Sequence, residues 1–258
     1  MKRLLAFTYG TVSYVLFLAS LLYAVAFLGN IGVAQTIDGA PRVPMGQALL
    51  INLLLLGIFA AQHSVMARPA FKRWWTQWVP QPVERSTYVW FSSAALLLLF
   101  HAWQPMGGLL WDVQNPLGRG LLYALFGGGW ILVLVATFLI NHFDLFGLRQ
   151  VWLYLRGQEY RPVPFATPWL YRYVRHPLYA GWLFVFWAAP TMTVAHLVFA
   201  AATTTYILMA IQLEERDLVA AHGRAYADYR TRVPMLIPGM KQKEIEGVGA
   251  KQATFSMF

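Results

Sequence analysis

Five long stretches of the sequence contain no aspartate, glutamate, lysine or arginine. They cover residues 4–37, 43–67, 86–111, 120–143 and 176–213. About 20 apolar residues are enough for a helix to cross the hydrocarbon core of a bilayer. The apolar centres of the first four stretches therefore predict one membrane span each, near residues 7–28, 46–66, 87–104 and 120–141.

The fifth stretch, residues 176–213, is too long for one span. Its 38 residues would form a continuous helix about 57 Å long, roughly twice the hydrocarbon thickness. Pro190 should break that helix near its middle. We expect a short arm near 178–189 and a long arm near 192–212. The pattern thus predicts an all-α, polytopic membrane bundle with four long spans and a C-terminal, Pro-broken hairpin, giving five or six crossings.

The composition agrees with a membrane protein. Hydrophobic residues make up 58% of the chain and charged residues 12%, against about 25% charged in a typical soluble domain. A soluble fold has no place for so much apolar surface. We therefore expect most of it to face lipid or neighbouring helices.

The charge distribution predicts an orientation. Lysine and arginine outnumber the acidic residues by 20 to 11, which gives a net charge of +9. The basic residues lie in short loops after the second and fourth spans, so we expect contact with anionic membrane lipids and no nucleic-acid partner. The loop that holds residues 37–44 carries only Arg42. The positive-inside rule then predicts an integral membrane protein with both termini in the cytoplasm.

No internal repeat or linker divides the sequence. We expect one domain over residues 1–240 and a flexible tail over 241–258. The chain has no cysteine, which excludes disulfides, thiolate nucleophiles and Cys-based zinc or iron–sulfur sites. We expect no metal site, and no feature indicates an obligatory protein partner.

The first chemically informative segment is residues 171–181. Pro177 suits the first turn of a helix and favours extended backbone at the preceding residue. Arg175 and His176 are therefore expected at the membrane interface, beside free backbone N–H groups where an anionic group can bind. A basic interfacial loop with a belt of tyrosines explains the same residues.

The second segment follows the long arm of the hairpin, which returns Glu214 and Glu215 to the neighbourhood of Arg175. His196 and Glu214 fall on one helical face, because the 18 residues between them make about five turns. The small side chains on that face either leave a groove or pack against another helix.

A groove that ends in carboxylates opposite an Arg-His pair suits an amphiphilic zwitterion. Its ammonium would meet Glu214 or Glu215, and its carboxylate would meet Arg175. If the ligand carried a sulfonium, Tyr179, Tyr226 and Tyr229 would supply cation–π contacts.

Residues 171–238 resemble the C-terminal signature of the isoprenylcysteine carboxyl methyltransferase-like membrane methyltransferases. The residues that carry the resemblance are Arg175, His176, Pro177, Leu178, Tyr179, Ala180, Gly181, Trp187, Pro190, Glu214, Glu215, Leu218, Gly223, Tyr226, Tyr229 and Pro234. The resemblance implies binding of S-adenosyl-L-methionine in the hairpin region. From this resemblance and from the fit to a zwitterionic ligand, we expect ten residues to bind the cofactor. They are Arg175, His176, Pro177, Tyr179, Gly181, His196, Glu214, Glu215, Tyr226 and Tyr229. The Arg-His-Pro-x-Tyr-x-Gly part also resembles a segment of the integral-membrane sterol reductases.

Residues 141–150, Asn-His-Phe-Asp-Leu-Phe-Gly-Leu-Arg-Gln, narrow the resemblance. With the chain length and span count, they are similar to the bacterial members of this family that methylate a small thiol, methanethiol, to dimethyl sulfide. A thiol is a poor nucleophile until it ionises, so we expect a base, and His142, Asp144 and Asn141 are the candidate catalytic residues. Direct pairing of His142 with Asp144 requires the helix to end near Asn141. Alternatively, Asn141 caps a helix and Asp144 pairs with Arg149 at the interface.

Other functions stay open on the sequence alone. An enzyme of the same fold can act on another acceptor, such as an isoprenylcysteine carboxylate or a lipid. A haem site would need His63 opposite His142. A transporter is less consistent with charges that cluster at one interface and with a single broken span.

Overall fold

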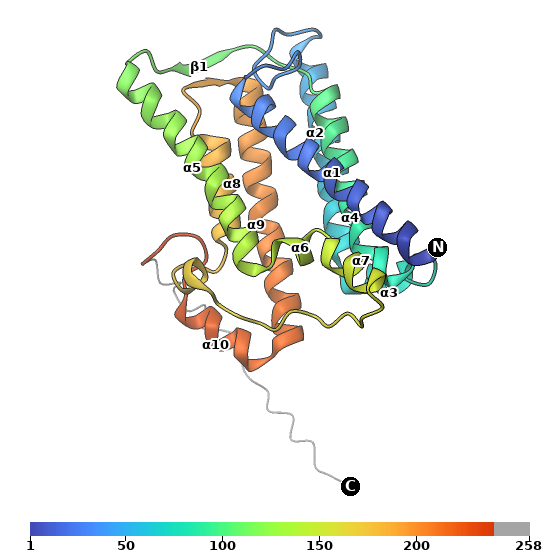
Figure 1. The fold of residues 1–258 in the computed structure, drawn as a ribbon. Coiled ribbons are helices and arrows are strands. Elements are labelled where there is room, and N and C mark those ends of the chain that lie inside the picture. Colours follow the sequence, from blue (N-terminus) through green and yellow to red (C-terminus); the bar gives the residue numbers. More distant parts are fainter. Residues whose placement is uncertain (240–258) are drawn as a thin grey trace.

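The computed structural model describes residues 1–239, and the tail expected over 241–258 lies outside them. Five helices run along the bundle in Figure 1: α1 (Lys2–Gly29), α2 (Met45–Ala67), α4 (Gln81–Ala102), α5 (Pro116–Ile140) and α9 (Val194–His222). The shorter elements are α3 (Pro69–Trp75), β1 (Leu109–Asp112), α6 (His142–Leu145), α7 (Leu148–Leu155), the 3-10 helix η1 (Trp169–Arg172), α8 (Pro177–Trp187), β2 (Thr191–Thr193) and α10 (Arg224–Arg232).

The predicted membrane bundle is confirmed. Helices α1, α2, α5 and α9 are long and apolar enough to cross a membrane. Helix α4, which covers most of the predicted span 87–104, is not among these four, and it packs beside α1 and α2. The lipid-facing character shows in large apolar side chains that are exposed along the bundle, such as Leu22, Leu54 and Ile131.

The Pro-broken hairpin is also confirmed. Helix α8 ends at Trp187, the chain turns through Pro190, and α9 begins at Val194 with the Thr193 hydroxyl accepting a hydrogen bond from the backbone N–H of His196. The 11 residues of α8 span only about 16 Å, roughly half the hydrocarbon thickness. The turn is tied down by β2, which pairs antiparallel with β1, a contact that the sequence pattern did not predict.

Helices α5 and α8 approach each other closely through two glycines. A Cβ atom on Gly181 would lie 2.9 Å from the carbonyl oxygen of Gly129, and one on Gly129 would lie 2.8 Å from that of Gly181. Neither glycine leaves room for a side chain. The structure therefore gives Gly181, expected as a cofactor-binding residue, a role in helix packing, where small residues let two backbones meet.

The two ends of the bundle differ in charge. One end, which we call the basic end, holds the N-terminus, α3, α6, α7, η1 and α10 (Figure 1). It carries the basic loops after α2 and α5. The other end, which we call the strand end, holds β1, β2 and residues 30–44. The expected catalytic residues and all of the expected cofactor-binding residues except Gly181 and His196 lie toward the basic end.

Candidate active site

A buried ionic cluster lies inside the basic end, where α8 and α9 meet. The Nε atom of Arg175 donates to Oε1 of Glu215 across 2.7 Å, and the Nε2 atom of His176 lies 3.0 Å from the same oxygen. The side chains of these three residues are 1 to 6% exposed. The return of the hairpin thus brings together the two segments that the sequence predicted to meet.

Backbone hydrogen bonds fix this cluster in place. The N–H groups of Arg175 and His176 donate to the carbonyls of Pro234 and Met235 at 2.9 and 3.1 Å. The Nη1 atom of Arg175 donates to the carbonyl of Val233 and, across 2.8 Å, to that of Arg230. Pro177 then starts α8, as its fixed φ angle favours. The segment after α10 therefore closes over the ionic cluster.

Two buried donors beside Glu215 have no partner among the described residues. They are the Nη2 atom of Arg175 and the hydroxyl of Tyr226, which is 2% exposed. A buried donor without an acceptor costs about 1–3 kcal/mol, so such groups generally face a ligand or an ordered water. A guanidinium and a phenol together suit a carboxylate, and the residues present therefore fit an amino-acid-like ligand.

Glu214 points to a different neighbour from Glu215. Its Oε2 atom accepts a hydrogen bond from the hydroxyl of Tyr179 across 2.9 Å, and its side chain is only partly buried. A second carboxylate with free acceptor capacity lies one residue from the buried pair. The two glutamates can thus divide their roles, Glu215 holding Arg175 and Glu214 available to a cation.

Aromatic rings line the site on its α10 side. The Phe165 ring lies within 6 Å of the rings of His222, Tyr226 and Tyr229. The Tyr229 hydroxyl donates to the carbonyl of Tyr171, and burial raises the pKa of Tyr229 to about 12, so that this phenol stays neutral. Phe165 was missed because it lies in a Pro-rich loop without helical period.

His142 and Asp144 are not paired. Helix α5 ends at Ile140, its C-cap Asn141 adopts a left-handed conformation, and the Asn141 side chain accepts from the backbone N–H of Asp144. The Asp144 carboxylate accepts from Arg149 across 2.8 Å instead. The expected His142–Asp144 pair is therefore wrong, because the cap turns Asp144 outward to the interface. Asn141 has a structural role as that cap.

His142 itself is buried, and its ring nitrogens contact two hydroxyls. Nδ1 lies 2.9 Å from Thr137 Oγ1, and Nε2 lies 2.8 Å from the hydroxyl of Tyr14. The Phe138 ring stacks on the imidazole at 4.3 Å. Burial lowers the pKa of His142, so the ring is neutral near pH 7. Sequence reasoning missed Tyr14 and Thr137, since each lies within an apolar run.

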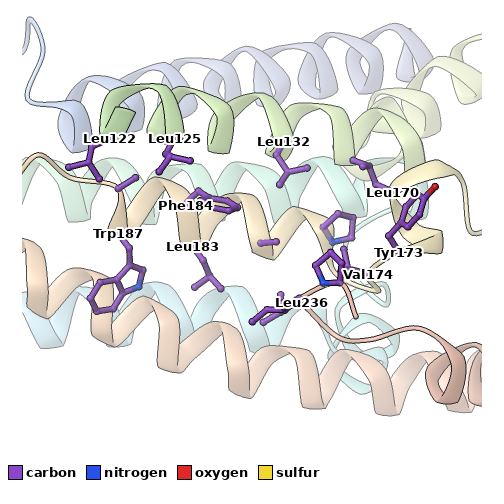
Figure 2. A pocket seen from close by; sticks show the side chains of 15 residues that line it. Leu122, Leu125, Leu132, Leu170, Tyr173, Val174, Leu183, Phe184, Trp187 and Leu236 are labelled. Atoms are coloured by element: carbon purple, nitrogen blue, oxygen red, sulfur yellow. The ribbon is translucent and has the colours of Figure 1, made fainter. Parts of the chain in front are cut away.

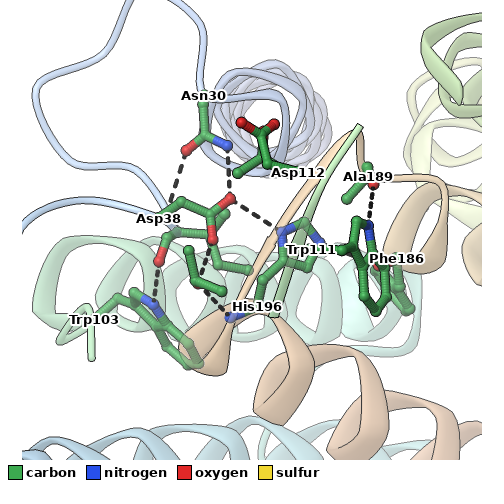
Figure 3. Close-up of polar contacts among 11 residues, drawn as sticks. Asn30, Asp38, Trp103, Trp111, Asp112, Phe186, Ala189 and His196 are labelled. Atoms are coloured by element: carbon green, nitrogen blue, oxygen red, sulfur yellow. Dashed lines mark hydrogen bonds and ion pairs between the residues drawn. The ribbon is translucent and has the colours of Figure 1, made fainter. Parts of the chain in front are cut away.

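His196 lies at the strand end, far from the ionic cluster. Its Nδ1 atom lies 3.1 Å from Asp38 and its Nε2 atom 3.1 Å from the carbonyl of Phe186 (Figure 3). The 18 residues from His196 to Glu214 correspond to about 27 Å of helix. One small ligand cannot bridge that distance, so His196 does not join the other expected cofactor-binding residues.

An apolar groove of about 770 Å³ lies between α5, α8 and residues 236–238 (Figure 2). Leu125, Leu183, Phe184 and Leu236 are among its lining residues, and of the expected cofactor-binding residues Pro177 alone lines it. Its walls offer almost no polar atoms to a charged ligand. The groove therefore has the character of a lipid-facing surface, and Arg175, His176 and Glu215 are not among its lining residues.

Comparison with known proteins identifies relatives over nearly the whole chain. Methanethiol S-methyltransferase of Crocosphaera subtropica is 57% identical over 243 residues, which is 94% of this chain and 95% of the relative. That of Mycobacterium tuberculosis is 55% identical and covers 92% of this chain and 98% of the relative. Nurim of Rattus norvegicus is 31% identical over 66% of this chain and 68% of its own length. No protein-family model and no solved structure matches the chain.

The apolar helices and these relatives place the chain among integral membrane methyltransferases. More specifically, it belongs to the methanethiol S-methyltransferase family. The family resemblance drawn from residues 141–150 and 171–238 is thereby confirmed.

Proposed function

We propose that this protein transfers a methyl group from S-adenosyl-L-methionine to methanethiol, giving dimethyl sulfide. The observation that carries the proposal is the buried Arg175–Glu215 pair with two unpartnered donors beside it, in a chain at least 55% identical to two methanethiol S-methyltransferases. When bound, the cofactor supplies an electrophilic methyl group on a sulfonium.

The residues of the basic end would hold that cofactor by its charged groups. Arg175 Nη2 and the Tyr226 hydroxyl would donate to the carboxylate, which satisfies both buried donors. Glu214 would accept from the ammonium. The aromatic rings of Phe165, Tyr226 and Tyr229 would supply stacking and cation–π contacts.

The remaining residues position these groups. Glu215 and His176 hold Arg175 in one orientation, and the segment that ends in Pro234 and Met235 covers the pair. A water-poor site strengthens the interactions of charged groups and favours an in-line approach of thiol and methyl. His142 would supply the base, through the hydroxyl contacts described above.

The membrane setting explains how both substrates arrive. The basic end would face the cytoplasm of a bacterial inner membrane, by the positive-inside rule, with its loops against anionic lipids. The charged cofactor would then enter from the cytoplasm. Methanethiol, small and apolar, would partition through the lipid and enter between the helices.

The test uses purified full-length protein in detergent or lipid vesicles. Headspace gas chromatography should detect dimethyl sulfide when both methanethiol and S-adenosyl-L-methionine are present, and the Glu214→Ala variant should form it much more slowly at a cofactor concentration near the wild-type Kd. Calorimetry should detect cofactor binding to the wild type. Binding without product would point to another acceptor, such as an isoprenylcysteine carboxylate or a lipid, and no binding would overturn the proposal.

A further inference from the structure

The proposed reaction requires removal of a proton from the thiol. The thiolate is the nucleophile, and an ordinary thiol holds its proton at neutral pH. Besides His176 in the ionic cluster and His222 in the aromatic wall, the basic half of the bundle holds two histidines, His142 and His63, each within hydrogen-bond distance of hydroxyl groups. The choice of the base between these two rests on the proposed function.

The His142 cluster has a fixed arrangement of protons. The Thr137 hydroxyl donates to the carbonyl of Leu134 across 2.7 Å, so its oxygen is left to accept from Nδ1–H of His142. The ring then carries its proton on Nδ1, and Nε2 accepts from the hydroxyl of Tyr14. A carbonyl, a hydroxyl, an imidazole and a phenol thus form one directed chain, in which a second group fixes the tautomer of the base.

The His63 cluster has no such direction. The Tyr88 hydroxyl lies 3.0 Å from Nδ1 and 2.9 Å from Nε2 of His63, and the Ser92 hydroxyl lies 3.2 Å from Nδ1. Neither contact selects one tautomer. A general base must present one defined nitrogen without a proton. The hydrogen bonds of His142 define that nitrogen, and those of His63 do not.

Tyr14 is more exposed than His142 and is therefore the end of this hydrogen-bonded relay that is open to a small substrate. His142 is 3% exposed and both ring nitrogens are occupied, whereas Tyr14 is only partly buried. The rings of Phe17, Phe143 and Phe146 lie within 6.4 Å of the Tyr14 ring. Aromatic rings make favourable contacts with sulfur, which suits a small thiol at this position.

Two further hydrogen bonds run from the neighbourhood of Thr137 to the aromatic wall of the cofactor site. Ala136, the neighbour of Thr137, accepts at its carbonyl from the hydroxyl of Tyr171 across 3.4 Å. The carbonyl of Tyr171 in turn accepts from the Tyr229 hydroxyl, in the aromatic wall of the cofactor site. Tyr171 is thus hydrogen-bonded both to the residue before Thr137 and to the aromatic wall of the cofactor site.

We infer that Tyr14 is a catalytic residue that takes the thiol proton and relays it to His142. The S–H proton moves to the Tyr14 oxygen as the Tyr14 proton moves to Nε2 of His142. A sulfur lone pair of the thiol forms the new S–C bond, the C–S bond of the methyl sulfonium breaks, and its electron pair stays on the departing sulfide. His142 then holds the extra proton until solvent takes it. Thr137 is a positioning residue that fixes the tautomer.

The test compares Tyr14→Phe with Tyr9→Phe, a matched change in the same helix. Tyr9 donates to Thr87 and has no contact with His142. With methanethiol at pH 7, kcat/KM of Tyr14→Phe should fall about 10²-fold or more, as for loss of a general base, while Tyr9→Phe stays within about twofold. The deficit of Tyr14→Phe should shrink as pH rises and the free thiolate fraction grows. It should also shrink with the more acidic 2,2,2-trifluoroethanethiol.

Two measurements do not depend on turnover. Calorimetry should show cofactor affinity unchanged in Tyr14→Phe. Nitrogen-15 NMR of histidine-labelled protein should show His142 of the wild type as the neutral Nδ1–H tautomer, and its Nε2 resonance should shift in Tyr14→Phe, which lacks the phenol that donates to it. The role of Thr137 is tested by activity. Thr137→Val should lose part of the methyl-transfer activity, whereas Thr137→Ser, which keeps the hydroxyl, should keep it.

The outcomes separate the relay from the proposed function. An equal loss for Tyr14→Phe at every pH and with both thiols would mean a structural role and overturn the relay. The same holds if His63→Asn, and not Tyr14→Phe, shows the pH-dependent loss. A wild type that binds the cofactor and methylates neither thiol would overturn the proposed function itself.

Discussion

Arg175 and Glu215 form a buried ion pair, with 2.7 Å between Nε and Oε1, although they are 40 residues apart in the sequence. Breaking such a pair leaves one charge buried without compensation, which costs about 3–5 kcal/mol. We therefore expect Glu215→Ala to lower the free energy of unfolding by about that amount. Chemical denaturation in detergent measures it, and Glu214→Ala should lose no more than about 1 kcal/mol. Equal losses would contradict the division of roles between the two glutamates.

Glu214 should matter for binding instead of stability. Its one described partner is the Tyr179 hydroxyl, so the carboxylate can accept from an ammonium. Loss of a charge-assisted hydrogen bond costs about 1.5–3 kcal/mol, which is about a 10- to 100-fold weaker Kd for S-adenosyl-L-methionine. Calorimetry on Glu214→Ala measures it, with Glu159→Ala, an exposed acid near α7, as the control. Unchanged affinity in Glu214→Ala would place the ammonium elsewhere.

The contact between Gly129 and Gly181 predicts a steric effect. Gly181→Ala places a methyl group within 2.9 Å of the α5 backbone, which must shift. We expect a loss of about 1–3 kcal/mol, as for other overpacked cores. Gly127→Ala, in α5 with nothing within 4 Å of its added Cβ, should be neutral or slightly stabilising. Thermal unfolding in detergent compares them, and a stable Gly181→Ala protein would show that the two helices can separate freely.

Asp38 should make stability depend on pH at the strand end. Burial opposes its charge, but hydrogen bonds from His196, Thr193 and Asn30 outweigh it and lower the pKa of Asp38 below its usual value. The stabilisation is therefore present above about pH 4, the pKa of an unfolded aspartate, and is lost as pH falls through the lower folded value. Asp38→Asn should be less stable than wild type by about 1.5–3 kcal/mol at pH 6. Unfolding from pH 3 to 7 should show that difference shrinking below pH 4; a constant difference would contradict it.

Much of the fold followed from sequence because apolar runs and Pro190 act locally. The uncharged stretches predict the long helices, and the hairpin predicts that Arg175 lies near Glu215. The β1–β2 pair was not predictable, because its two strands are only four and three residues long and lie about 80 residues apart.

The site was harder to predict residue by residue. His196 and Glu214 share one face of α9, but sharing a face does not bring two residues close along the helix axis. His196 lies at the strand end of the bundle and Glu214 at the basic end. Gly181 was expected to bind the cofactor, but its close contact with Gly129, which the sequence does not reveal, gives it a role in helix packing. Asp144 was expected to orient His142, but the Asn141 cap turns it toward Arg149. Thr137 contacts the His142 ring instead. It lies within an apolar stretch, where the sequence gives no sign of this role.

The most direct test of the account follows the methyl group itself. Purified full-length protein in lipid vesicles is mixed with methanethiol and S-adenosyl-L-methionine that carries a trideuterated methyl group, and the headspace is examined by mass spectrometry. The account predicts dimethyl sulfide with one trideuterated methyl group, formed at a rate that Glu214→Ala greatly reduces. Dimethyl sulfide without the label, or labelled product formed equally well by Glu214→Ala, would contradict it.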